Sequence, residues 1–212
     1  MRSLVSTGKA LCLLSLGTIL SLIAAGTASA EDKKKSLDNL GTAFNGESNA
    51  NAKYVAYARK ADEEGYGEVA SLFRAAARAE EIHAKNHAEV IRKMGGEAKA
   101  DIKAAVVKTT RENLEDALKG ETDEKDTMYP GFIETADAEG DTEALRTFSY
   151  ALYAETQHAR LYKKALDTLD SLKGSKAKDY FVCPTCGNTG PAVPFEKCPV
   201  CASPKEKFEK VS

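Results

Sequence analysis

Residues 80–83 of the chain read Glu-Glu-Ile-His and residues 155–158 read Glu-Thr-Gln-His, so the spacing Glu-x-x-His occurs twice. Each copy lies in a long segment whose apolar residues recur every three or four positions, the pattern of an amphipathic helix. A glutamate and a histidine three positions apart lie on one face of a helix, so both can reach the same ion. The two copies therefore predict a helical protein that binds metal between its helices.

Glycines divide the middle of the chain into helical segments, with boundaries at Gly65, Gly95 and Gly140. Pro130 predicts a kink inside the third segment. Two helical hairpins joined by one longer connection predict an all-α, ferritin-like four-helix bundle over residues 36–172. The four predicted helices cover about residues 36–64, 68–94, 111–138 and 142–172.

Glutamates interrupt the apolar stripe of each predicted helix near its middle. A single such glutamate would reach solvent from the edge of the stripe, but the inward faces of the four helices carry five. Burying an ionised carboxylate without a partner costs roughly several kcal/mol, and no Lys or Arg occupies these stripe positions. Two multivalent cations balance this charge, and the pattern matches that of di-iron and di-manganese bundles. The predicted metal ligands are Glu47, Glu80, His83, Glu121, Glu124, Glu155 and His158.

Three further residues lie near these positions in the sequence pattern. Tyr54 and Tyr129 are expected to donate hydrogen bonds to the ligand carboxylates, although a tyrosine at either position alone more often serves core packing. His87 follows His83 by four positions and could face the same way. The ligand set is complete without His87, so we expect it behind the ligands or at the surface.

A cysteine-rich tail follows the predicted bundle. Two Cys-x-x-Cys pairs with eleven residues between them predict one four-sulfur metal site in a small module, residues 178–212. Residues 173–178 are expected to form a polar linker before it. Two disulfides are the alternative interpretation, and the spacing does not separate iron from zinc. The four ligands would be Cys183, Cys186, Cys198 and Cys201.

The first thirty residues have the layout of a secretory signal peptide. Arg2 and Lys9 precede an apolar run of 15 residues, and Ala28-Ser29-Ala30 offers a cleavage site. A membrane anchor is the alternative, but a bilayer span needs about 20 apolar residues. We therefore expect cleavage after Ala30 and an exported, periplasmic protein with no membrane span after cleavage.

The charge balance excludes one class of partner. The 212 residues include 30 Lys and Arg against 32 Asp and Glu, a net charge of −2. Such a chain has no basic excess to neutralise phosphates, so nucleic acid is not expected as the main partner.

Residues 36–212 resemble the rubrerythrins, which join a ferritin-like di-iron bundle to a C-terminal rubredoxin-like domain. The resemblance implies two irons in the bundle, one iron held by the four cysteines as an electron relay, and reduction of hydrogen peroxide to water in oxidative-stress defence. It also implies a homodimer or larger homo-oligomer in which one subunit's tail lies near the other's di-iron site. The matching segments are Gly46–Ser48 with Tyr54, Glu80–His83, Gly120–Glu124 with Met128–Pro130, Glu155–His158 and the two cysteine pairs.

The same resemblance implies separate roles for the ligands. Glu80 and Glu155 would bridge the metals, and the other three glutamates would be terminal. Glu124 and His83 match the residues that exchange at one iron between oxidation states. Because we expect export, the electron donor would be an extracytoplasmic protein, which the sequence does not identify.

Two other functions compete with a peroxidase. A ferroxidase or iron-buffering protein that uses oxygen would also need a ferritin-like bundle, but it would not need a four-cysteine module. A non-enzymatic interaction module with a zinc ribbon tail would need neither the inward glutamates nor the inward histidines. The sequence therefore favours the peroxidase.

Overall fold

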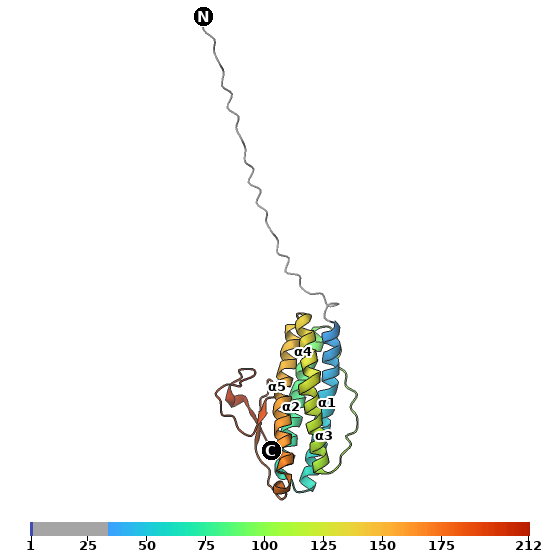
Figure 1. Cartoon of the computed structure of the whole chain (residues 1–212), viewed down its shortest axis with the longest axis vertical. Coiled ribbons are helices and arrows are strands. Elements are labelled where there is room, and N and C mark those ends of the chain that lie inside the picture. Colours follow the sequence, from blue (N-terminus) through green and yellow to red (C-terminus); the bar gives the residue numbers. More distant parts are fainter. Residues whose placement is uncertain (2–33) are drawn as a thin grey trace.

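The structure is a computed structural model that describes Met1 and residues 34–212. Apart from Met1, the predicted signal peptide at residues 1–30 lies outside the described residues. The larger part is the predicted ferritin-like four-helix bundle, in which α3 and α4 together form one of the four rods (Figure 1). Its helices are α1 (Lys34–Glu63), α2 (Gly67–Lys93), α3 (Thr110–Asp123), α4 (Tyr129–Ala138) and α5 (Thr142–Asp167).

The helix boundaries follow the signals in the sequence. Gly65, Gly95 and Gly140 have φ angles of 77°, 80° and 63°, a conformation that ends helices and that glycine adopts without strain. Thr109 and Glu112 form a reciprocal capping box at the start of α3. The local sequence therefore sets where each rod of the bundle begins and ends.

A π-helical turn, η1 (Glu124–Met128), joins α3 to α4. Pro130 has no N–H to donate to the preceding turn, and the ladder changes register just before it. The Tyr129 N–H bonds to the Glu124 carbonyl, a spacing of five residues. The kink predicted at Pro130 is thus realised as a π-turn that begins at a predicted metal ligand.

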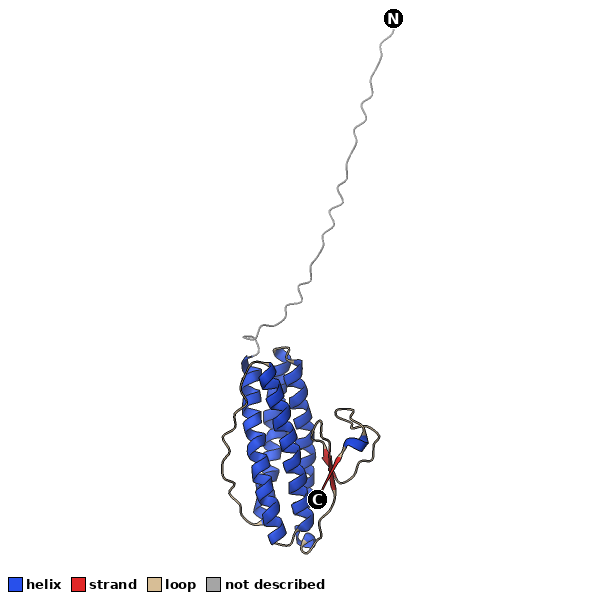
Figure 2. Ribbon diagram, turned by 180° about the vertical axis from the view of Figure 1, so that it is seen from behind, coloured by secondary structure: helices blue, strands red, loops and turns tan. Residues whose placement is uncertain are grey.

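The connection between the two hairpins, residues 97–109, runs along the length of the bundle without regular structure (Figure 2). We call this segment the strap. Side-chain amides of α1 form hydrogen bonds with the backbone of the strap, in place of the bonds that a neighbouring strand would make. Asn45 Oδ1 accepts from the Asp101 N–H at 2.8 Å, and Asn49 Oδ1 accepts from the Lys103 N–H at 2.9 Å. These bonds fix the strap over the outer face of α1.

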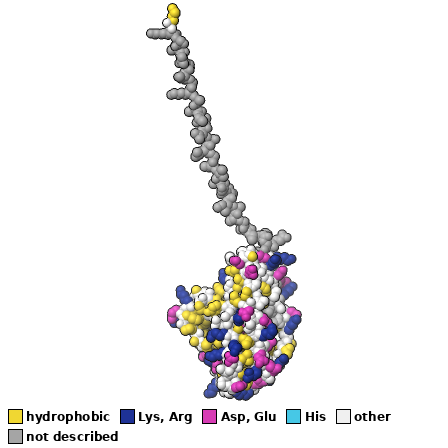
Figure 3. Space-filling view, in the orientation of Figure 1, with side chains coloured by type: hydrophobic (Ala, Val, Ile, Leu, Met, Phe, Trp, Pro, Cys, Tyr) yellow, Lys and Arg dark blue, Asp and Glu magenta, His cyan; other side chains and the backbone are white. Residues whose placement is uncertain are grey.

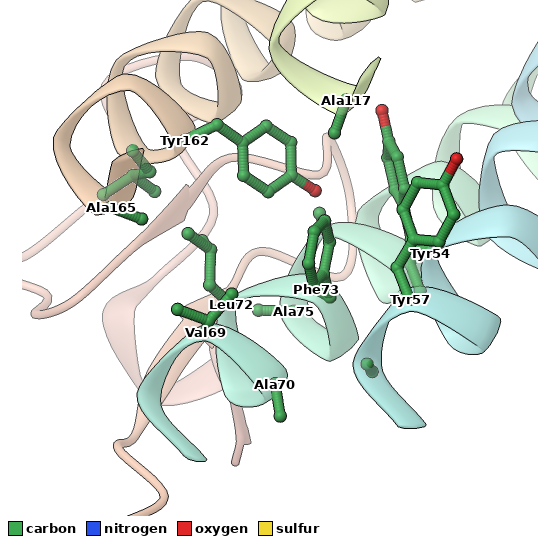
Figure 4. Packing of buried hydrophobic residues seen from close by; sticks show 14 of the residues in the cluster. Tyr54, Tyr57, Val69, Ala70, Leu72, Phe73, Ala75, Ala117, Tyr162 and Ala165 are labelled. Carbon is green, nitrogen blue, oxygen red and sulfur yellow. The ribbon is translucent and has the colours of Figure 1, made fainter. Parts of the chain in front are cut away.

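Buried side chains form two clusters, one toward each end of the bundle. The cluster that includes Tyr54, Tyr57, Phe73 and Tyr162 is rich in aromatic rings, which pack against one another with centroids 5.3–6.3 Å apart (Figure 4). Aromatic contacts at these separations stabilise a core beyond the area they bury.

The tail forms a small sheet against α2 and α5, with strand order β2-β1-β3 and antiparallel pairing. One short 3₁₀ turn, η2 (Leu169–Leu172), precedes the sheet in the chain, and another, η3 (Lys205–Lys207), lies between β2 and β3. Hydrophobic side chains gather on the module, whereas acidic and basic ones alternate over this face of the bundle (Figure 3). The strands are β1 (Tyr180–Val182), β2 (Thr189–Gly190) and β3 (Glu209–Val211).

The module is anchored to the bundle at several points. Tyr180 and Val182 of β1 are buried in the same cluster as the bundle aromatics. The Arg78 guanidinium donates to both carboxylate oxygens of Glu209, at 2.7 and 3.0 Å. The Ser175 carbonyl, in the segment predicted to be a linker, accepts from the Gly67 N–H at 3.2 Å. The polar linker is therefore bonded to the bundle along part of its length.

Among the described residues, no helix is long and apolar enough to cross a membrane.

Candidate metal centres

Two groups of buried ligand side chains meet in the middle of the bundle, between its two hydrophobic clusters. In each group, one ligand atom per residue lies within 4.8 Å of the others. Glu80 and Glu155 belong to both groups, which is the arrangement expected of residues that bridge two metals. The first group is Glu47, Glu80, His83 and Glu155, and the second is Glu80, Glu121, Glu155 and His158.

Glu80 and Glu155 each place one carboxylate oxygen near His83 and the other near His158. His83 Nδ1 lies 2.9 Å from Glu80 Oε2 and 3.0 Å from Glu155 Oε1. His158 Nδ1 lies 3.2 Å from Glu80 Oε1 and 2.8 Å from Glu155 Oε2. The site is therefore nearly symmetric, with one imidazole and one oxygen from each shared glutamate on each side.

Several of the carboxylate oxygens lack the hydrogen bonds that buried charges need. Buried oxygens of Glu47, Glu80, Glu121 and Glu155 have no hydrogen-bond partner in the described structure. Four carboxylates carry a formal charge of −4, and two divalent cations carry +4. Buried orphan oxygens with one imidazole on each side fit two hard or borderline cations such as iron.

The pKa values of these groups express the same deficit of positive charge. Burial raises the pKa of Glu47 well above its ordinary value, and Glu124 and Glu155 raise it further. Burial also raises the pKa of Glu121. It opposes the charge on His158 as well, but Glu121 and Glu80 outweigh it and raise that pKa. A cluster that would otherwise take up protons is suited to metal ions, which supply the positive charge instead.

Glu124 is the one predicted bundle ligand that belongs to neither group. It is half-buried at the start of the π-turn, and burial together with the charge on Glu121 raises its pKa. In a regular helix Glu124 would lie on the face of Glu121, three residues earlier. The Glu124 N–H still bonds to the Gly120 carbonyl, so Glu124 keeps this register, and the π-turn changes the ladder only after it.

Tyrosine hydroxyls donate hydrogen bonds to two of the carboxylates. The Tyr54 hydroxyl donates to Glu121 Oε1 at 2.7 Å, and the Tyr129 hydroxyl donates to Glu47 Oε1. Such bonds fix the orientation of carboxylates that hold a metal.

His87 is fully buried behind Tyr129. Its Nε2 lies 3.2 Å from the Tyr129 hydroxyl and its Nδ1 lies 3.1 Å from Thr147 Oγ1. Because the Tyr129 proton is bonded to Glu47, Nε2 must be the donor and Nδ1 the acceptor from Thr147. Burial, followed by the charge on His83, lowers the pKa of His87 to about 3. Thr147 was not identified from the sequence, because no local pattern links it to His87.

The four cysteines of the tail form a second site. They are free thiols in one group, with Sγ–Sγ distances of 3.5 Å for Cys183–Cys201 and 3.6 Å for Cys186–Cys198. A tetrahedral ion with metal–sulfur bonds of about 2.3 Å requires sulfurs about 3.8 Å apart. The geometry therefore fits one iron or zinc ion and not two disulfides. The Asn188 amide also approaches Cys198 Sγ, at 3.7 Å, a contact that the sequence pattern did not reveal.

The two sites come together at His83. Its Nε2 donates to the carbonyl oxygen of Cys186 at 3.3 Å. The next residue, Gly187, has a φ of 75°, and a Cβ there would lie 2.1 Å from His83 Nε2. Sequence reasoning missed this role of Gly187, because the partner lies more than 100 residues away in the chain.

Comparison with known proteins supports both centres. The rubrerythrin family model matches residues 38–166. Rubrerythrin-2 of Clostridium acetobutylicum is 37% identical over 174 residues, which is 81% of this chain and 94% of the relative. Nigerythrin of Nitratidesulfovibrio vulgaris is 39% identical over 173 residues, which is 81% of this chain and 84% of the relative.

Solved structures agree with the sequence relatives. Nigerythrin in its fully reduced, all-ferrous state superposes with a TM-score of 0.75 at 32% identity, covering 97% of this chain and all of the other. A bacterioferritin of Desulfovibrio desulfuricans, at 24% identity and a TM-score of 0.65, shares the fold over 73% of this chain and 95% of the other.

Proposed function

Since the chain belongs to the rubrerythrin family, we propose that it reduces hydrogen peroxide to water in defence against oxidative stress. The family and the two ligand sets make it an iron-binding oxidoreductase with a di-iron site and a rubredoxin-type iron or zinc site. Our proposal adds two points to this: hydrogen peroxide is the substrate, and electrons reach the di-iron site through the four-cysteine site. The observation that carries it is the pair of glutamates, Glu80 and Glu155, that serve both ligand groups.

The residues that would hold the two irons divide by position. Glu80 and Glu155 would bridge, Glu47 and His83 would complete one side, and Glu121 and His158 the other. Glu124 is adjacent to the groups but outside both, so we propose that it would bind an iron in only one oxidation state, as the resemblance implies. When bound, two ferrous irons supply the two electrons that cleave the O–O bond of peroxide.

The protein's own contribution is to hold the ligands and their protons in place. Burial raises the pKa of Tyr54 and of Tyr129, so both hydroxyls keep their protons and remain donors to Glu121 and Glu47. Reduction of peroxide to two waters consumes two protons. Tyr54 borders a cavity and is therefore a suitable hydroxyl to transmit protons from solvent.

The tail would return electrons to the bundle. Its sulfur ligands and the His83 ring are linked through the Cys186 backbone and one hydrogen bond. We propose that Cys183, Cys186, Cys198 and Cys201 hold a redox-active iron that receives electrons from a donor protein. A ferritin-like iron store has no use for such a module, so the ferroxidase alternative is not favoured.

Stopped-flow kinetics test the proposal directly. The chemically reduced protein should consume one equivalent of hydrogen peroxide per di-iron site within the first turnover. The visible spectrum should return to that of the oxidised protein at the same rate. Slow reaction with peroxide but fast reaction with oxygen would contradict the proposal and support iron oxidation instead.

We further propose that the protein works outside the cytoplasm after cleavage at Ala30. The support is the sequence layout of residues 1–30 alone. N-terminal sequencing of the protein from a periplasmic extract should give Glu31 as the first residue. Recovery of the full-length chain in the cytosol would contradict this proposal.

The assembly we propose is a homodimer or a larger homo-oligomer, as the resemblance implies. Light scattering of the purified protein should give at least twice the mass of one chain, and a monomer mass would exclude it.

A further inference from the structure

A cavity of about 410 Å³ lies between α1, α3 and the strap. Two of its wall residues belong to the surroundings of the di-iron centre. Glu124 is one, and Tyr54, which donates to Glu121 at 2.7 Å, is the other. The cavity thus extends from the outer face of the bundle to the residues next to the metal ligands. Three other cavities of the described chain are lined by none of the seven predicted bundle ligands, whereas Glu124 lines this one.

Two glycines inside helices line this cavity. Gly46 of α1 directly precedes Glu47, and Gly120 of α3 directly precedes Glu121. A Cβ at either position would meet no atom within 4 Å, and neither glycine has a positive φ. Glycine is unfavourable inside a helix, so these two positions are costly without serving close packing or a turn. What they share is the open space in front of them.

The walls of the cavity suit an uncharged molecule. Lys53 pairs with Asp116 at 2.8 Å, and the Tyr57 hydroxyl donates to the same carboxylate at 2.9 Å. Among all charged wall residues, Lys53, Lys103 and Lys108 balance Glu112, Asp116 and Glu124, so the formal charge of the lining is zero. The strap above is held by Asn49, so the opening is a fixed feature of the fold.

We propose that this cavity is the access route by which a small neutral oxidant reaches the di-iron centre, and that Gly46 and Gly120 keep the route open and limit the size of what passes. The choice of peroxide as that oxidant rests on the proposed function; the route itself does not. The two glycines are specificity-determining positions, and neither touches the reacting atoms.

Nitric oxide provides a probe that is independent of turnover, because it is small, uncharged and binds ferrous iron. We would measure its association and dissociation rates on the reduced, iron-loaded protein by stopped-flow absorbance. In Gly46→Leu and Gly120→Leu, a leucine side chain would occupy part of the route. In the double variant, which carries both leucines, the association and dissociation rates should each fall at least tenfold. The equilibrium Kd should stay within twofold, because nitric oxide crosses the same obstruction on entry and on exit.

The chain provides matched controls. Gly41 of α1 and Gly131 of α4 also lie inside helices with no atom within 4 Å of a Cβ, but neither lines the cavity. Gly41→Leu and Gly131→Leu should leave both rates within twofold. Gly46→Ala and Gly120→Ala provide a smaller obstruction and should slow both rates less than leucine does. Thermal unfolding and iron content establish that each variant is folded and loaded.

Three outcomes would overturn the proposal: unchanged rates in the double variant, equal slowing in the controls, or a changed Kd with an unchanged association rate. If the protein proves not to reduce peroxide, the nitric oxide rates still decide whether the route exists. If it does, the double variant should discriminate more strongly against tert-butyl hydroperoxide relative to hydrogen peroxide than the unmodified protein, by at least fivefold. No change in that ratio would remove the size limit from the proposal.

Discussion

His83 Nε2 lies 3.3 Å from the carbonyl oxygen of Cys186, so a single imidazole connects the two metal sites of the chain. Its other nitrogen, Nδ1, faces Glu80 and Glu155 at 2.9 and 3.0 Å. The hydrogen bond at Nε2 therefore fixes which nitrogen can bind a metal. The resemblance implies that one subunit's tail lies near the other's di-iron site, whereas the described chain places its tail against its own His83.

Gly187→Ala tests whether this contact matters. The new Cβ would lie 2.1 Å from His83 Nε2, so the module must move away. We expect the rate at which a donor re-reduces the di-iron site to fall more than tenfold, with the bundle iron content unchanged. Stopped-flow re-oxidation and re-reduction cycles would measure this.

Gly174→Ala is the matched control for that variant. Gly174 has a φ of 77°, so alanine there meets the same backbone strain, but no atom lies within 4 Å of its Cβ. It should therefore leave re-reduction nearly unchanged. Similar slowing in both variants would mean that backbone strain, and not the approach to His83, is responsible.

Helical periodicity was sufficient to predict the rods of the bundle, because burial of one face dictates the spacing of apolar residues. The same periodicity identified the glutamates as candidate metal ligands, since a charged residue in an apolar stripe needs a partner of opposite charge. Contacts across elements were not predictable in this way. The chain of hydrogen bonds from Thr147 through His87 to Tyr129 depends on how three helices pack. The π-turn at Glu124 depends on a local change in the helical hydrogen-bond register.

Glu80→Gln should remove at least one of the two irons. The amide keeps the shape of the side chain but loses the charge and one oxygen of a residue shared by both ligand groups. Metal analysis of the purified variant measures the loss. Glu81→Gln is the control, because the Glu81 carboxylate is next to Glu80 in the sequence but is exposed and pairs with Arg78. Two irons retained in Glu80→Gln would rule out its role as a bridge.

His87→Gln should reduce the loss of stability on acidification. The unfolded histidine takes up a proton below about pH 6.5, whereas burial lowers the folded pKa to about 3. The unfolded state thus binds more protons between these values, and stability falls as the pH falls. From pH 7 to pH 5 this amounts to at most about 2 kcal/mol.

Denaturant unfolding of the iron-loaded protein and the variant at both pH values would measure that difference. The metal ligands titrate in both proteins, so their contribution largely cancels in the comparison. Glutamine can still bond to Tyr129 and Thr147, which limits the structural change. Equal losses in the two proteins would show that His87 is not the group responsible.

Cys186→Ser should separate the first turnover from the later ones. The bundle ligands belong to α1, α2, α3 and α5, so the bundle should fold and keep two irons. The chemically reduced variant should then consume its first equivalent of peroxide at the normal rate, because those electrons already reside in the bundle. Steady-state turnover with a protein donor should fall by at least 100-fold, because the relay is lost. Unchanged steady-state turnover would exclude the tail as an obligatory relay.

Mixed oligomers of Cys186→Ser and Glu155→Ala distinguish relay within a chain from relay between chains. In the first variant only the tail is defective, and in the second only the bundle site. If electrons pass through the contact between His83 and Cys186 of the same chain, as the 3.3 Å hydrogen bond indicates, no chain in the mixture is complete and activity stays at the level of the separate variants. If the tail of one subunit serves the bundle of another, hybrids purified through two different affinity tags should recover up to about half of the activity of the unmodified oligomer, because half of their bundle sites are intact. Recovery would therefore overturn the within-chain relay while leaving the tail's role as a relay intact.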